Sequence, residues 1–253
     1  MKALRGLWFT IISIILTYYV AVLAHEYGHG TMAWIFGYKT SPFDIQYGSW
    51  YLVPVDEAVN YPALLSAGHG VQAGLIGIAG ITTTFLLFLM SLFSLSKSVI
   101  QKNSFLLSFF FWLAAINLME MFSYLNRSFL MDGDMGRFVH GLNISPLWVF
   151  IPGSIIVCLS LYRFYKVEII KLFKFLPIQT KIMQRIVLWL TFWQLPLSVM
   201  FYWAGSGAVD PGWSLVSNTA HGISLAIIIF ILIICHSGYR IFYGSPENYL
   251  DKD

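Results

Sequence analysis

Long apolar runs separated by short polar stretches make up most of the chain, and these runs determine the expected fold. They cover residues 4–37, 64–95, 105–125, 148–161, 186–204 and 220–239. A helix needs about 20 mostly apolar residues to cross the ~30 Å hydrocarbon core of a bilayer, and most of the runs approach or exceed that length. The pattern therefore predicts an all-α polytopic membrane protein with about six transmembrane helices.

Residues 39–62 interrupt the apolar runs with a different pattern. Phe43, Ile45 and Tyr47 alternate with polar residues before Gly48-Ser49, and an extended run follows at 50–54. Alternation with a period of two on both sides of turn residues predicts a short β-hairpin, whose aromatic side chains suit the headgroup region. One free edge of this interfacial β-hairpin is a candidate for binding an extended peptide by main-chain pairing. An ordinary interfacial loop is the alternative.

The composition agrees with a membrane protein. Hydrophobic residues make up 58% of the chain and charged residues only 11%, whereas soluble domains contain about 25% charged residues. The connections between the apolar runs are too short for a separate soluble domain, so residues 1–253 are expected to form a single membrane-embedded domain. Cys158 and Cys235 each lie alone in an apolar run, and they predict small packed residues rather than a redox pair.

The basic residues indicate an orientation and a lipid contact. Six of them lie among aliphatic residues in the segment 163–185, which predicts an amphipathic helix on an anionic membrane surface. Nucleic-acid binding is not expected, because aliphatic residues interleave with the charges. With six spans, twelve of the 15 Lys and Arg residues lie on the side of the termini and three on the other side. The excess predicts that both termini are cytoplasmic.

Two histidines and a glutamate break the first apolar run, in the order His25-Glu26-Tyr27-Gly28-His29. Positions i and i+4 of a helix lie on one face, so the imidazoles of His25 and His29 can occupy two corners of a zinc tetrahedron. Glu26 is then beside the metal, where it can take a proton from water. Each ionisable group costs about 3 kcal/mol in a membrane helix without a partner. The sequence therefore predicts a metal site here.

Polar residues of the second and third runs are further candidates. His69 lies in a glycine-rich stretch, where Gly70-x-x-x-Gly74 predicts close packing between helices. We expect His69 to be a packed polar residue near the site, with stabilisation of an oxyanion as an alternative role. Glu120 lies in the third run and should point into the helix bundle, because a carboxylate needs a partner in lipid.

The segment after the third run carries the remaining candidates. It contains Asn126, Asp132 and Asp134, and the two aspartates flank Gly133. A solvated loop is one interpretation. The other is that an aspartate returns toward His25 and His29, because two histidines, one carboxylate and an open position form a common catalytic zinc site.

These residues together resemble the site-2 protease family of intramembrane zinc metalloproteases. The resemblance covers residues 4–140 and leaves 141–253 as additional transmembrane helices. In that family a segment of the form Asn-x-x-Pro, ending in Leu-Asp-Gly-Gly-Arg, supplies the third zinc ligand. This chain has no proline after Asn126. Asp134 matches the family spacing and the Gly-Arg ending at Gly136-Arg137, whereas Asp132 preserves the Asp-Gly dipeptide, so Asp134 is favoured and Asp132 is the alternative. Glu120 or another histidine is a more distant choice.

The resemblance implies an intramembrane zinc metalloprotease that hydrolyses peptide bonds of membrane-spanning or membrane-associated proteins. One Zn²⁺ would be held by His25, His29 and Asp134, with Glu26 as the general base. Asn126 or His69 would steady the substrate oxyanion. Two other classes stay open. One is a membrane zinc hydrolase acting on lipid or amide substrates, and the other is a non-catalytic metal-binding membrane protein.

Overall fold

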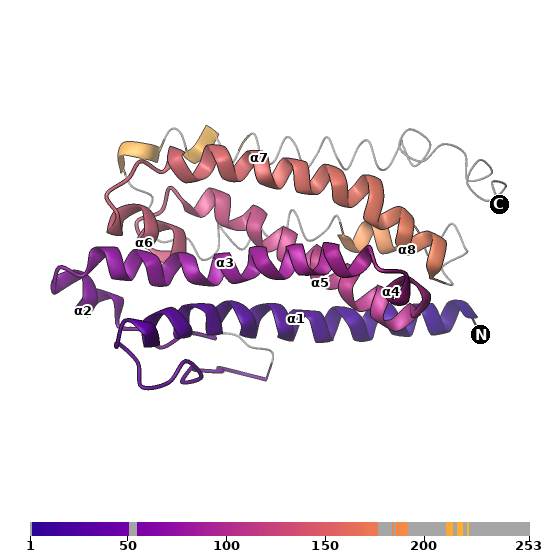
Figure 1. The fold of residues 1–253 in the computed structure, drawn as a ribbon. Coiled ribbons are helices and arrows are strands. Elements are labelled where there is room, and N and C mark those ends of the chain that lie inside the picture. The colour runs from indigo at the N-terminus through magenta and orange to yellow at the C-terminus, as the bar shows by residue number, and fades with distance from the viewer. Residues whose placement is uncertain are drawn as a thin grey trace.

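The structure is a computed structural model that describes residues 2–50, 55–176, 184, 186–191, 211–214, 217–219 and 222. Within these residues the chain is mostly helical and contains no strand (Figure 1). Four helical stretches are long and apolar enough to cross a membrane, which indicates a membrane protein: Trp8–Ile35, Gly70–Leu95, Ser104–Leu125 and Leu147–Phe175. The predicted spans at 186–204 and 220–239 lie largely outside the described residues.

Helix α1 (Lys2–Ile35) is the longest element. Its 34 residues extend about 50 Å, so it exceeds the ~30 Å core of a bilayer. Gly37, with φ +80°, ends the helix, as the Gly37 and Tyr38 N–H groups bond back to the Trp34 and Ala33 carbonyls. This arrangement caps the last carbonyls of the helix and turns the chain away from its axis.

The segment between α1 and α2 is a loop in the described residues. Gln46 and Asp56 form an isolated antiparallel bridge, with N···O distances of 2.8 and 3.0 Å, and no strand extends from it. The predicted β-hairpin is therefore not confirmed. Part of its second strand, residues 51–54, lies outside the described residues.

Two long helices form the centre of the bundle. The short helix α2 (Tyr61–Ser66) leads into α3 (Gly70–Leu95), and α4 (Ser98–Lys102) leads into α5 (Ser104–Arg127). Helix α5 contacts α1, α3, α6, α7 and α8. Most of its middle is buried, including Phe111, Trp112, Leu113, Ala114 and Leu118. Because α5 packs on every side, polar groups that it carries face other helices rather than lipid.

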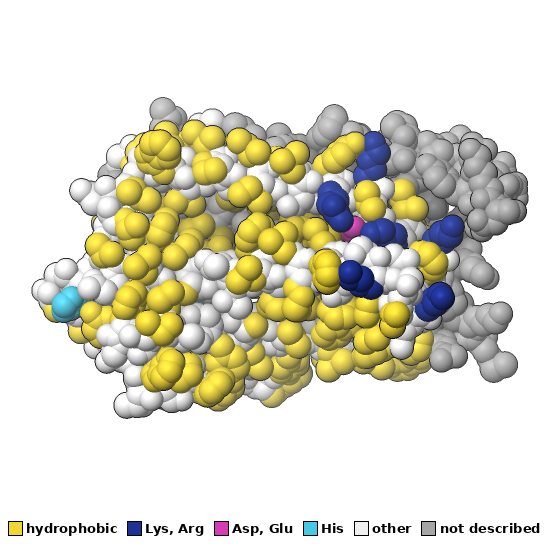
Figure 2. All heavy atoms as spheres, viewed as in Figure 1, with side chains coloured by type: hydrophobic (Ala, Val, Ile, Leu, Met, Phe, Trp, Pro, Cys, Tyr) yellow, Lys and Arg dark blue, Asp and Glu magenta, His cyan; other side chains and the backbone are white. Residues whose placement is uncertain are grey.

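The remaining elements lie around this centre. They are α6 (Gly133–Gly141), α7 (Leu147–Arg163), the π-helix η1 (Phe164–Glu168), α8 (Ile169–Phe175) and the short 3₁₀ helix η2 (Pro211–Trp213). Helices α7, η1 and α8 run on without a break, so the first part of the basic segment 163–185 continues the fourth span. Figure 2 shows Lys and Arg side chains gathered at the end of the bundle where α4 and α8 lie in Figure 1.

Large apolar side chains are exposed along α1 and α7. On α7 these include Trp148, Ile155 and Leu159, which are 76%, 58% and 64% exposed. Figure 2 shows hydrophobic side chains spread over the length of the visible face. A surface of this kind is expected where helices face lipid, because apolar side chains need no burial there.

Candidate metal centre

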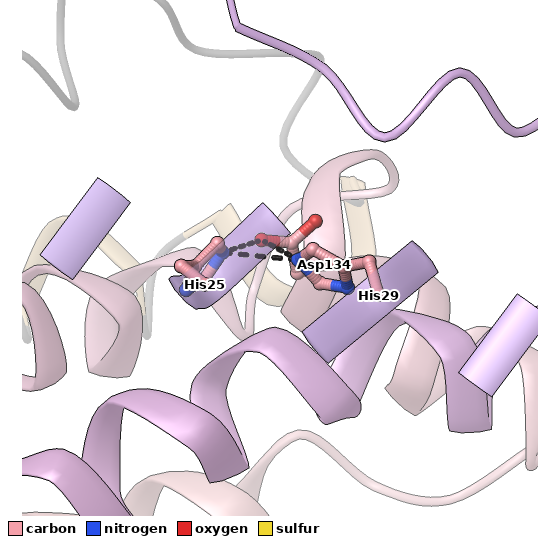
Figure 3. Close-up of side chains that lie close together, drawn as sticks. All are labelled: His25, His29 and Asp134. Carbon is pink, nitrogen blue, oxygen red and sulfur yellow. Dashed lines mark hydrogen bonds and ion pairs between the residues drawn. The ribbon is translucent and has the colours of Figure 1, made fainter. Parts of the chain in front are cut away.

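Three side chains far apart in the sequence meet at one point. His25 and His29 project from the same face of α1, and Asp134 reaches them from the first turn of α6 (Figure 3). His25 Nε2 lies 3.0 Å from His29 Nε2, and Asp134 Oδ2 lies 3.3 and 3.4 Å from these two nitrogens. The prediction that His25, His29 and Asp134 lie together is confirmed in its geometry.

The three distances match the edges of a zinc coordination tetrahedron. Atoms at two corners of a tetrahedron with bonds of ~2.05 Å are about 3.3 Å apart, and zinc bonds to imidazole nitrogen and carboxylate oxygen have that length. The side chains of His25 and His29 are 4% and 1% exposed and that of Asp134 is 14% exposed, so the three are shielded from bulk water. The residues present fit a zinc ion with one position open.

The contacts of the Nδ1 atoms determine which nitrogen of His25 and His29 is free to bind a metal. His29 Nδ1 lies 2.7 Å from the Ile76 carbonyl oxygen, which can only accept a hydrogen bond. His25 Nδ1 lies 3.2 Å from Glu120 Oε1 and 3.0 Å from Thr84 Oγ1. With the proton on Nδ1 in each ring, both Nε2 lone pairs point toward Asp134. Three electron-rich atoms this close repel one another unless a cation lies among them.

When no metal is bound, a proton on a histidine can be that cation. Its effect is seen in the pKa of Asp134. Burial raises the pKa of the Asp134 carboxyl, but the positive charge of His29 and hydrogen bonds from His25 and His29 outweigh burial. The pKa of Asp134 therefore lies well below its usual range. Asp134 is a carboxylate at neutral pH, as a metal ligand must be.

The glycine face of α3 brings these side chains together. A Cβ on Gly80 would overlap Nε2 of His29, and a Cβ on Gly77 would lie 2.6 Å from the backbone oxygen of Asp134. Gly74 is as close to α6, where a Cβ would lie 3.1 Å from the Arg137 carbonyl oxygen. On α1, a Cβ on Gly28 would lie 2.9 Å from the Ala79 carbonyl oxygen. The close packing predicted for this stretch is confirmed, and it holds α1 and α6 against α3.

The two candidate aspartates have different surroundings. Asp134 is in the first turn of α6, whereas Asp132 is the exposed N-cap residue and does not belong to the metal-binding group. Gly133, with φ +81°, lies between them and allows the turn that begins the helix. Only the favoured aspartate therefore joins the histidines.

Glu120 is not part of the three-residue group but supports it. Its side chain points into the bundle, as predicted, and contacts the back of the His25 ring. A carboxylate on the outer nitrogen of a ligating histidine fixes the ring and increases its basicity. Thr84 of α3 also contacts Nδ1 of His25, at 3.0 Å, and is fully buried. The sequence analysis missed Thr84, which is one of three consecutive threonines at 82–84 and has no motif of its own.

Tyr124 is a second residue that the sequence analysis missed. It follows Glu120 by one turn of α5, and its hydroxyl oxygen lies 3.0 Å from His25 Nε2. The two rings are stacked, with centroids 5.3 Å apart and planes 15° apart. The only signal in the sequence is the spacing of Glu120 and Tyr124, which puts both on one helix face.

Glu26 and Glu57 bring two further carboxyl groups close to the site. The Glu26 carboxylate is within electrostatic range of His25, His29 and Asp134. Its Oε2 atom is buried and has no hydrogen-bond partner among the described residues. Glu57, from the loop before α2, is 4% exposed, and its Oε1 lies 3.6 Å from Arg137. Arg137 also lies 3.6 Å from Asp134 Oδ1 and stacks on the Tyr61 ring.

Of the two predicted substrate-binding residues, the structure describes the side chain of His69 but not that of Asn126. His69 is the exposed N-cap residue of α3, and it contacts the Tyr38 ring. It precedes Ile76 by seven residues, or about 10 Å along the helix. The structure therefore does not bring His69 to the ligands. Asn126 is in the last turns of α5, and its side chain lies outside the described part of the chain.

Comparison with known proteins assigns no family. No protein-family model, no curated protein and no solved structure matches the chain. Functional interpretation therefore rests on the residues and their geometry.

Proposed function

We propose that this protein is an intramembrane zinc metalloprotease of the site-2 protease type. The observation that carries the proposal is the meeting of His25, His29 and Asp134 at tetrahedral distances, next to a glutamate with a buried, unpaired oxygen. Two nitrogens, one oxygen and an open position form a catalytic rather than a structural zinc set. A structural site has no use for a carboxylate such as Glu26.

Each residue has a role that follows from its chemistry. A bound zinc ion would polarise the scissile carbonyl group and make water a better nucleophile. Glu26 accepts a proton from the attacking water and returns it to the leaving amine. Glu120 and the Ile76 carbonyl hold the two imidazoles with Nε2 facing the metal. Arg137 lies against the second oxygen of Asp134, which leaves Oδ2 for the metal.

The position of the ligands along α1 supports a substrate that spans or lies in the membrane. His29 precedes the end of the span at Ile35 by six residues, or about 9 Å along the helix, so the site belongs to one side of the bilayer. A transmembrane substrate helix hides its carbonyls in its own hydrogen bonds and must unwind to be cut. The described parts of the loop between α1 and α2, residues 39–50 and 55–60, leave α1 at the end of the bundle where α2 lies (Figure 1), and their backbone can pair with an extended segment.

The topology belongs to the same proposal. Six transmembrane helices with cytoplasmic termini put the His29 end of α1 on the opposite side, away from the basic residues of α4 and α8. Surface lipids with anionic headgroups would contact that basic end.

The test is proteolysis by the purified protein in lipid vesicles. A set of transmembrane peptides is incubated with wild-type protein and with Glu26→Gln, and the products are identified by mass spectrometry. Cleavage by wild type, its loss on chelation, and no cleavage by zinc-loaded Glu26→Gln support the proposal. Hydrolysis of lipids or simple amides but not of peptides would instead favour a different zinc hydrolase. No hydrolysis of any substrate would favour a non-catalytic metal protein.

A further inference from the structure

The Tyr124 hydroxyl group lies beside the candidate ligands, within hydrogen-bonding reach of both His25 and Asp134. The hydroxyl oxygen is 3.0 Å from His25 Nε2, the nitrogen that faces the metal. Tyr124 is 7% exposed, and its ring packs with Ile81 of α3 and Met135 of α6. Stacking on the His25 ring fixes its direction. The phenol is thus held rigidly and aimed at the site.

The hydrogen bond to His25 cannot persist when a metal is bound. A neutral imidazole has one lone pair, and the proton on Nδ1 of His25 faces the Glu120 carboxylate. Without a metal, the lone pair on Nε2 can accept the Tyr124 hydroxyl proton whenever that nitrogen is not itself donating to Asp134. If a metal were bound by His25, that lone pair would be used for the metal–nitrogen bond. The hydroxyl group would then donate to Asp134, with which it also makes a hydrogen bond, or to a substrate atom bound beside the ligands.

We propose that Tyr124 is a catalytic residue whose hydroxyl group donates a hydrogen bond to the oxygen of the scissile carbonyl. This inference rests on the proposed protease function and names the group that stabilises the oxyanion. Negative charge develops on that oxygen as water adds, and a fixed donor in a dry site stabilises it more than water would. No proton is transferred by Tyr124, because the phenol only shares its hydrogen.

The geometry favours Tyr124 over His69 for this role. His69 is exposed just before the first residue of α3. The Tyr124 hydroxyl oxygen, by contrast, is within hydrogen-bond distance of His25 Nε2, a candidate ligand atom. A phenol is neutral at physiological pH and is a stronger donor than an aliphatic alcohol. It can therefore stabilise a developing charge without adding a charge to the buried ligand set.

The experiment compares Tyr124→Phe with wild type in lipid vesicles, and uses Tyr162→Phe as the control. Tyr162 is exposed on α7, where its hydroxyl oxygen accepts a hydrogen bond from Lys166, so this control removes a hydroxyl group far from the ligands. Zinc affinity, the visible absorption spectrum with Co²⁺ in the site, peptide cleavage, and binding of a phosphinic peptide that mimics the oxyanion are measured for all three proteins.

We expect Tyr124→Phe to bind zinc with an affinity within about threefold of wild type and to keep the Co²⁺ spectrum. Its kcat falls by about 10²–10³ with little change in KM, as for the loss of an oxyanion donor. Binding of the phosphinic peptide weakens by a similar factor, and Tyr162→Phe matches wild type in every measurement.

Two results would overturn the inference while leaving the protease proposal intact. Full cleavage activity in Tyr124→Phe would show that the phenol is not needed. A large loss of zinc affinity with an altered Co²⁺ spectrum would make Tyr124 a metal ligand instead. If wild type cleaves no peptide at all, the protease proposal itself fails, and the role of Tyr124 fails with it.

Discussion

Gly80 of α3 lies directly against the imidazole of His29, where a single methyl group would overlap Nε2. The absence of a side chain at this position lets the ring lie flat on the helix and donate from Nδ1 to the Ile76 carbonyl, one turn earlier. The missing side chain at Gly80 is therefore a contribution of helix α3 to the site, because it leaves room for the His29 ring. The metal geometry depends on helix packing as much as on the ligands.

Replacing Gly80 with alanine should therefore weaken metal binding. Overpacking a close contact costs about 1–3 kcal/mol, and here the ring that must move is a ligand. If the cost falls on the bound state, zinc affinity drops by about 10–100-fold. Competition with a calibrated chelator measures this change in detergent-solubilised protein.

Gly153→Ala on α7 is the matched control. A Cβ at Gly153 meets only the Leu125 side chain, which can change rotamer, and α7 carries no ligand. Its zinc affinity should equal that of wild type. Equal zinc affinity in Gly80→Ala would show that His29 is not bound where the structure has it.

The two aspartates should respond differently to loss of charge. Asp134→Asn removes a ligand oxygen, so zinc affinity should fall by more than the about 10–100-fold that outer partners cost. Asp132→Asn alters an exposed cap residue and should leave the affinity unchanged. Metal titration of both variants at one pH provides the measurement. Weaker binding in Asp132→Asn alone would reassign the third ligand to Asp132.

Loss of the acceptors behind His25 should affect the metal without removing a ligand. Glu120→Gln keeps an acceptor and should cost at most about tenfold in zinc affinity, whereas Thr84→Val with Glu120→Leu removes both acceptors and should cost about 10–100-fold. Ser91→Ala, which removes another buried hydroxyl group from α3, is the control. If the double variant binds zinc as wild type does, His25 is not oriented through Nδ1.

Removing only Arg137 from its ion pair with Glu57 should lower the stability of the protein more than removing both residues. Arg137→Met leaves the Glu57 carboxylate buried without its cation. We expect the free energy of unfolding to fall by about 3 kcal/mol. This is the low end of the range for buried pairs, because the Arg137 side chain is a quarter exposed. The double variant with Glu57→Leu should recover most of this loss. Thermal unfolding in detergent compares the three. Equal stability of the single and double variants would mean that the pair does not interact.

The parts of the site that sequence could predict are those encoded by local spacing. His25 and His29 are one helical turn apart, and the glycines of α3 recur at helical spacing, so both features follow from one segment each. Asp134 was favoured by its distance from Asn126 and by Gly136-Arg137, and the structure puts it with the histidines.

Residues whose position depends on how helices cross could not be predicted. Thr84, Tyr124 and Glu57 contact the site only because α3, α5 and the loop before α2 converge on α1. The residues that flank them in the sequence form no pattern that indicates a metal site. His69 lies just before the first residue of α3, about two helical turns from Ile76, so its glycine-rich surroundings did not indicate its distance from the ligands. Period-two alternation at 43–47 predicted strands, whereas the described residues there form only one bridge.

The most direct test of the central claim is metal analysis of the purified wild-type protein combined with X-ray absorption at the zinc edge. We predict one zinc ion per chain, with nitrogen and oxygen neighbours at ~2.0–2.1 Å, an imidazole signature and no sulfur. His25→Ala should lose this zinc. A protein that binds no stoichiometric metal, or one whose zinc is unaffected by His25→Ala, would contradict the account.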